Sequence, residues 1–121
     1  MAEWSVVETA GGVFSPLSPT ATNFDLALAL EPAIWVLVAP DALGVLHDLS
    51  ATLQAMRARG RTPDHVVLSG AREPDSSTGS NAAELEALGI VATSAVLARN
   101  DDRGIASLVE RLLAGQNLVE R

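Results

Sequence analysis

The fold is decided by residues 33–68, which read AIWVLVAPDALGVLHDLSATLQAMRARGRTPDHVVL. The stretch begins and ends with segments that are almost entirely apolar, residues 33–39 and 65–68. Apolar segments without polar alternation are typical of strands buried on both faces of a parallel sheet. Between them, apolar side chains recur at spacings of three and four, which predicts a helix over about residues 45–59. This stripe consists of Leu46, Leu49, Leu53 and Met56. The stretch therefore predicts a strand, a helix and a second, parallel strand.

The same alternation extends to both sides of this unit. We expect further strands at residues 4–8 and 90–97, a loop over 9–19, a short helix or turn over 24–30 and a polar loop over 72–80. We also expect a helix from Asn81 to Gly89, with Asn81 and Glu84 as a capping box, and a last helix from Asp101 or Asp102 to Gly115. Strands alternating with helices imply an α/β fold, here a parallel sheet of about four strands flanked by helices, in a single domain over residues 1–121.

Composition excludes several classes of function. The formal net charge of −7 argues against a nucleic-acid partner or an anionic membrane surface, because both require positive charge. Cysteine is absent, which excludes disulfides and thiol catalysis. All eight basic residues are arginine, so these residues offer no lysine nucleophile and no ammonium for a phosphate. With no apolar run long enough to cross a bilayer and no signal peptide, we expect a cytoplasmic protein.

The segment from residue 4 to residue 44 contains a set of motifs in a fixed order. They are Glu8-Thr9-Ala10-Gly11-Gly12, Pro16-Leu17, Asp25, the apolar residues 33–39 and Leu43-Gly44. This set resembles the C-terminal half of the dethiobiotin synthetases, whose pattern is a strand ending in Glu-Gly-Ala-Gly-Gly, then a Pro-Leu turn, an Asp, a strand, and Leu-Gly at the start of a helix. Order and spacing hold from about residue 3 to residue 114, so the resemblance implies half of a P-loop NTPase-like domain.

The resemblance also implies an activity and a set of site residues. Members of the family close the ureido ring of dethiobiotin from 7,8-diaminononanoate, carbon dioxide and ATP with Mg²⁺, and they act as homodimers. By resemblance, Glu8 is a Mg²⁺ ligand, and the loop Thr9, Ala10, Gly11 and Gly12 lies against the phosphates. Ser69 takes the position of an adenine-reading Asn. The residues that would face the carboxylate of the diamine are Leu43, Gly44, Val45, Leu46 and His47.

The sequence departs from the family pattern in ways that bear on catalysis. The P-loop of the Gly-x-x-x-x-Gly-Lys-Thr type and the substrate-activating Lys do not occur in these residues. Thr9, Ser69 and Leu46 replace a Gly, an Asn and an Asn of the family. We therefore assign no catalytic residue, and we expect ATP and Mg²⁺ to be used only if a partner chain completes the site.

Two functions follow from this pattern. The first is a subunit of a divided dethiobiotin synthetase, inactive alone and completed by a chain that carries the P-loop. The second is a non-catalytic assembly or binding module that keeps the fold of the family. In both, strand edges left without a partner favour association with that chain or with further copies, as a homo-oligomer.

The remaining polar residues have simpler interpretations. His47 fits a first-turn or interface position and His65 a structural one. Ser15 and Ser18 suit turns rather than a nucleophile. The acids at turns and caps, which show no metal-ligand spacing, are Asp41, Asp48, Asp101 and Asp102.

Overall fold

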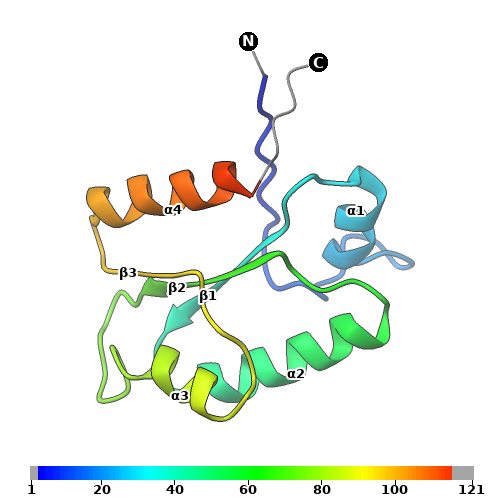
Figure 1. Cartoon of the computed structure of the whole chain (residues 1–121). Helices are drawn as coiled ribbons and strands as arrows, with labels where there is room; N and C mark the ends of the chain where they lie inside the picture. Colours follow the sequence, from blue (N-terminus) through cyan, green and yellow to red (C-terminus); the bar gives the residue numbers. More distant parts are fainter. Residues whose placement is uncertain (1–2, 116–121) are drawn as a thin grey trace. The chain divides into compact units, whose positions relative to one another are not determined.

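The computed structural model describes residues 3–115, and the chain divides into two compact units, residues 1–33 and 34–121. Figure 1 traces the elements of both units in chain order. Each unit is described by itself, beginning with the second, which contains the sheet.

The second unit is a parallel α/β sandwich. Its elements, in order, are β1 (Val36–Asp41), α2 (Val45–Ala58), β2 (His65–Gly70), α3 (Asn81–Ala87), β3 (Ala95–Leu97) and α4 (Asp102–Ala114). The strand order is β1-β2-β3, and both pairings are parallel. Helices α2 and α3 lie on one side of the sheet and α4 on the other (Figure 1). The predicted fold class is confirmed, with three paired strands in the described residues.

The apolar stripe of α2 builds the core beneath the sheet. Leu49, Leu53 and Met56 are buried as predicted, but Leu46 is only half-buried. Val45 is buried in its place, with 2% of its surface exposed. Val45 is the first residue of α2, and it is buried together with Leu49, Leu53 and Met56. The central strand β2 is buried on both faces at residues 66–68, as predicted.

The prediction that residues 33–39 are buried on both faces is wrong. The strand itself runs from Val36 to Asp41, and burial alternates along it, with Val38 58% exposed. The cause is its position, because β1 is an edge strand and α4 packs against β3, the opposite edge. No helix of the described residues 34–115 covers Val38.

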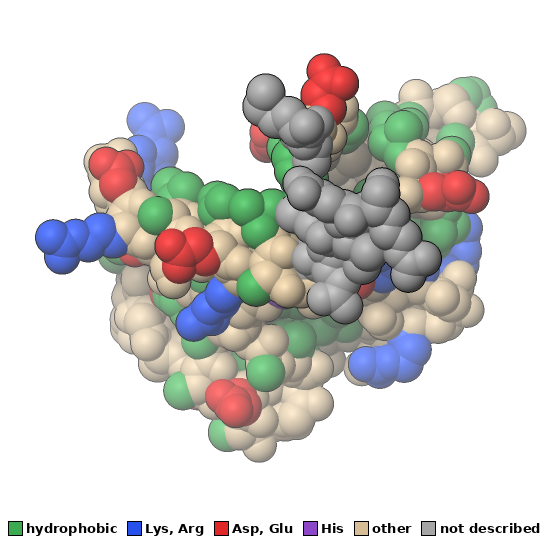
Figure 2. Space-filling model, turned by 45° about the horizontal axis from the view of Figure 1, so that its top comes forward, with side chains coloured by type: hydrophobic (Ala, Val, Ile, Leu, Met, Phe, Trp, Pro, Cys, Tyr) green, Lys and Arg blue, Asp and Glu red, His purple; other side chains and the backbone are tan. Residues whose placement is uncertain are grey.

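Helix α4 begins where the sequence predicts, with the Asp101 Oδ1 accepting a hydrogen bond from the Gly104 N–H at 2.8 Å. Its apolar stripe is not buried, however, since Ile105 and Val109 are 49% and 45% exposed. Figure 2 shows a row of hydrophobic side chains on the face of the molecule that it presents. Strand β3, against which α4 packs, has three residues and is too short to cover the apolar side of the helix.

Two further predictions are corrected in this unit. Ser80, not Asn81, precedes α3 as its cap, and Asn81 is 3% exposed with its side chain directed elsewhere. The predicted capping box is therefore wrong. Of the strand predicted over residues 90–97, only Ala95–Leu97 pairs with β2. The residue before it, Ser94, donates its N–H to the Val66 carbonyl at 2.8 Å.

The first unit contains one helix, α1 (Asn23–Leu30), and the loop before it. Thr22 and Asp25 form a capping box, in which the Asp25 carboxylate accepts from the Thr22 N–H at 2.7 Å. Phe14 and Phe24 stack with their ring centroids 5.3 Å apart. The strand predicted at residues 4–8 is wrong, because this segment pairs with no strand of the described chain and Val6 is 93% exposed.

None of the helices in the described residues 3–115 is long and apolar enough to cross a membrane.

Candidate functional site

The glycine loop of the first unit has a backbone that only glycine suits. Gly11 has a φ of +82°, and a Cβ added there would lie 2.9 Å from the Ser15 Oγ. The Gly12 N–H donates to that same Oγ at 2.9 Å, and the Ser15 N–H donates back to the Gly12 carbonyl at 3.1 Å. Ser15 therefore fixes the turn through its hydroxyl and its backbone.

Asn23 holds the same loop from the start of α1. Its Nδ2 donates to the Ala10 carbonyl and to the Gly12 carbonyl, each at 2.8 Å, and the residue is 1% exposed. Both bonds engage carbonyl groups. Within residues 3–115, the backbone N–H groups of Ala10 and Gly11 have no protein acceptor. The loop is thus fixed while two of its donors stay available.

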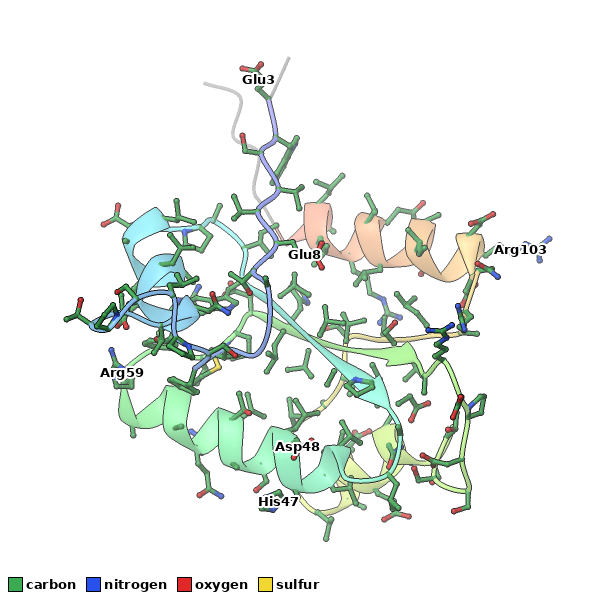
Figure 3. All side chains as sticks on the ribbon, turned by 180° about the vertical axis from the view of Figure 1, so that it is seen from behind. Glu3, Glu8, His47, Asp48, Arg59 and Arg103 are labelled. Carbon is green, nitrogen blue, oxygen red and sulfur yellow. The ribbon has the colours of Figure 1, made fainter. Side chains whose placement is uncertain are left out.

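Glu8 precedes this loop and is exposed on an extended segment (Figure 3). In the described part of the chain, no three His, Asp or Glu side chains lie close enough together to hold a metal ion. Magnesium at phosphate sites takes one or two carboxylates and completes its shell with phosphate oxygens and water. One exposed carboxylate beside a loop with free N–H groups fits that donor set, so Glu8 remains the predicted ligand.

A second polar cluster lies at the carboxyl end of β1, and sequence reasoning missed it. Asp41 is 3% exposed, and its carboxylate accepts from the Gly79 N–H at 3.0 Å and from the Asn81 Nδ2 at 2.7 Å. The Thr78 hydroxyl donates to the Asp41 carbonyl at 3.0 Å. Ligands of parallel sheets bind outside the carboxyl ends of the strands. An acid ending an apolar run was the available signal, but it had been interpreted as an ordinary turn residue.

Asp75 ties the same loop to the start of α2. Its carboxylate accepts from the Leu43 N–H at 2.9 Å, from the Ser77 N–H at 2.8 Å and from the Ser77 hydroxyl at 2.6 Å. The hydrogen bond from Leu43, followed by those from Ser77, lowers the pKa of Asp75 below its ordinary value. The N–H expected to face a ligand carboxylate is therefore already bonded to a carboxylate of this chain.

The other predicted site residues of the second unit differ in accessibility. Leu43 is 81% exposed, and Gly44 precedes α2 with a φ of +98° and no side-chain cap. Val45 belongs to the core. His47 is exposed on the side of α2 that faces away from the sheet (Figure 3). Leu46 and Ser69 are half-buried, and Ser69 pairs with Pro40 and Leu97 near the carboxyl end of the sheet. Their roles in binding stay predictions.

The amino end of the sheet carries a structural polar group. His65 Nδ1 and Ser94 Oγ are 2.8 Å apart, and Asp64 accepts from the Trp35 N–H at 2.6 Å. Burial acts to raise the pKa of Asp64, but the bond from Trp35 and the guanidinium of Arg61 outweigh it and lower that pKa. The contact between His65 and Ser94 fits the structural role predicted for His65. An adjoining cavity of about 260 Å³ is lined by apolar residues and by the polar side chains of Arg57, Thr62, Asp64 and Ser94.

Comparison with known proteins finds similarity to several dethiobiotin synthetases. It is 42% identical over 65 residues to the ATP-dependent dethiobiotin synthetase BioD of Caulobacter vibrioides strain NA1000, covering 54% of this chain and 29% of that protein. The BioD of Rhodopirellula baltica is 36% identical over 91 residues, covering 66% and 35%. That of Anaeromyxobacter dehalogenans strain 2CP-1 is 39% identical over 84 residues, covering 69% and 37%. The chain thus spans about a third of the length of these relatives. No solved structure matches it.

A family model described as an AAA domain matches residues 2–104, which is most of the chain and includes both the glycine loop and the sheet. The chain therefore belongs to this AAA-domain family.

Proposed function

We propose that the chain is a subunit of a divided dethiobiotin synthetase. It supplies the part that carries Glu8 and the glycine loop, and a second polypeptide supplies the P-loop. The observation that carries the proposal is the loop after Glu8, whose Ala10 and Gly12 carbonyls accept from Asn23, while the N–H groups of Ala10 and Gly11 have no acceptor among residues 3–115. Backbone donors on a glycine turn are suited to phosphate oxygens. The names of the similar proteins support ATP as the source of that phosphate.

Each part of the loop has a defined task in this proposal. Glu8 holds Mg²⁺, and the ion, when bound, neutralises phosphate charge. The Gly11 N–H and its neighbours bind and orient the phosphates. Thr9, half-buried where the family has Gly, leaves less room beside them. Ser69, with a shorter side chain than Asn, gives weaker recognition of adenine.

The start of α2 would receive the diamine. Leu43 to His47 face its carboxylate, with the exposed backbone at Leu43 and Gly44 as the point of contact. The Leu43 N–H is bonded to Asp75. The substrate carboxylate therefore has to displace Asp75 or use a neighbouring N–H group.

The proposal assigns the phosphate-binding loop and its Lys to a partner chain. P-loop enzymes hold the β- and γ-phosphates with a loop backbone and its Lys, and these 121 residues contain no Lys. The exposed edge of β1 and the uncovered stripe of α4 provide apolar surface for a partner.

The test is reconstitution. The chain is co-expressed with a P-loop polypeptide encoded beside it, and the purified pair receives 7,8-diaminononanoate, bicarbonate and Mg-ATP. We expect dethiobiotin by mass spectrometry, reduced at least tenfold by Glu8→Gln and unchanged by Glu31→Gln, an exposed acid after α1. A stable pair that forms no dethiobiotin overturns the proposal.

A second candidate is a non-catalytic assembly module. It is favoured by one observation, the Asp75 carboxylate on the Leu43 N–H, because that contact satisfies the donor a substrate would need. This candidate predicts a stable oligomer on a sizing column and no thermal shift with Mg-ATP. Tight binding of nucleotide by the isolated chain would exclude it.

A further inference from the structure

Asn23 is a buried polar residue that the sequence pattern did not single out. It is the first residue of α1, next to the Thr22–Asp25 capping box, yet its side chain plays no part in that cap. Its Nδ2 instead reaches back 13 and 11 residues, to the carbonyls of Ala10 and Gly12. Its own N–H donates to the Ser15 carbonyl at 3.0 Å. Asn23 therefore connects the helix to the glycine loop.

The orientation of the Asn23 amide is fixed by these contacts. Its Oδ1 is buried and, in the described chain, has no hydrogen-bond partner. A flipped amide would place that oxygen against two carbonyl oxygens, so the donors must face the loop. A buried acceptor without a partner costs stability. An apolar residue would avoid this cost, which indicates that the two bonds to the loop matter beyond packing.

The two bonds also determine where the loop donors point. In a trans peptide the carbonyl of one residue and the N–H of the next point in opposite directions. Holding the Ala10 carbonyl toward Asn23 therefore turns the Gly11 N–H away from it. Gly11 is exposed and has no side chain, so that N–H faces outward. The bond to the Gly12 carbonyl fixes the Gly12–Val13 peptide in the same way.

We propose that Asn23 is the positioning residue that presents the Gly11 N–H to an anionic group, which is the triphosphate if the proposed function holds. Asn23 itself stays buried and does not touch the ligand. The inference rests on the proposed function only for the identity of that ligand.

The first test uses the full chain without a ligand. Asn23→Asp keeps the shape of the side chain but replaces both donors by an acceptor. We expect the Gly12 and Ser15 amides to exchange with deuterium at least tenfold faster by NMR, while the amides of β2 keep their protection. Should the buried carboxylate prevent folding, Asn23→Ala removes the donors without adding charge. Unchanged exchange at Gly12 and Ser15 in a folded variant overturns the proposal.

The second test uses the reconstituted pair. Asn23→Ala is expected to raise the KM for Mg-ATP about tenfold, with kcat and the KM for the diamine within twofold of the parent. Thr22→Ala is the matched control, because it weakens the cap of α1 and leaves the Asn23 bonds in place. It should lower the unfolding temperature and leave the KM for Mg-ATP unchanged.

These two tests separate the possible failures. A parent pair that forms no dethiobiotin refutes the proposed function, while the exchange data still decide whether Asn23 holds the loop. Faster exchange with an unchanged KM for Mg-ATP means that Asn23 has a structural role only, and it overturns the inference. Equal effects of Thr22→Ala and Asn23→Ala on that KM would do the same.

Discussion

The loops at residues 9–13 and 72–80 each lie beside a buried Asn that is the first residue of a helix. The two loops differ in which of their backbone groups form the hydrogen bonds that hold them. Asn23 donates to carbonyls of the first loop. The second loop is held by the carboxylates of Asp41 and Asp75, which accept from its N–H groups, and Asn81 donates to Asp41. We call the bonds from Asn23 the first clamp and the bonds to Asp41 and Asp75 the second clamp. The bonds from Asn23 use carbonyl groups of the first loop, and in the described residues they leave its Ala10 and Gly11 N–H groups without a protein acceptor. The phosphate contact that we propose is therefore assigned to the first loop.

The largest effect is expected at the second clamp. Asp41→Ala removes the acceptor of the Gly79 N–H and one of the two acceptors of the buried Asn81 amide, which keeps its bond to the Ser77 Oγ at 3.2 Å. We expect a loss of about 3 kcal/mol in the free energy of unfolding, since buried donors left unpaired cost about 1–3 kcal/mol each. Urea denaturation measures it.

Asp48→Ala is the control, because Asp48 is an exposed acid on the neighbouring helix α2. Its effect should stay within about 0.5 kcal/mol. Equal effects of the two substitutions would show that the Asp41 clamp contributes nothing to stability.

A smaller effect is expected at the first clamp. Gly11→Ala forces a side chain into a φ of +82° and toward the Ser15 Oγ. We expect a loss of about 1–2 kcal/mol, which is the cost of a left-handed residue with a Cβ. Gly12→Ala is the matched control, because its Cβ would lie 3.6 Å from the same oxygen and its φ is not positive. If Gly12→Ala proves the more destabilising, the loop has a different conformation.

The same contrast explains which parts of the molecule the sequence could predict. Helix α2 was predictable, because its apolar side chains recur every three or four residues, which is a pattern within a short stretch of sequence. The cap of α4 at Asp101 was equally local. By contrast, Asn81 matched a capping-box pattern, but its side chain bonds to Asp41, 40 residues earlier. A local motif cannot reveal that a distant carboxylate competes for the same amide.

The strand at residues 4–8 failed for a related reason. A strand requires a neighbour, and residues 3–8 pair with no strand of the described chain. The glycine loop was recognised because the family motif lies in consecutive residues, while Asn23, which holds it, lies 11 residues beyond Gly12. The sequence therefore identified the loop that carries the predicted chemistry but not the residue that orients it.

The smallest effect is a difference in pH dependence between the two clamps. Hydrogen bonds lower the pKa of Asp75 below its ordinary value of 3.8. Its stabilising contribution is therefore complete above pH 3.8 and is lost as the pH falls through the lower, folded-state pKa. The Leu43 and Ser77 amides should then shift in NMR spectra below pH 3.8, and Asp75→Asn should abolish that titration.

The Gly12 and Ser15 amides provide the internal reference for this titration. Asn23 carries an amide, which does not ionise in this range, so the first clamp should hold where the second loosens. Parallel shifts of both sets of amides would mean that acid unfolds the chain as a whole. Shifts confined to Leu43 and Ser77 would show that the second loop can release the start of α2 while the glycine loop keeps its hydrogen bonds.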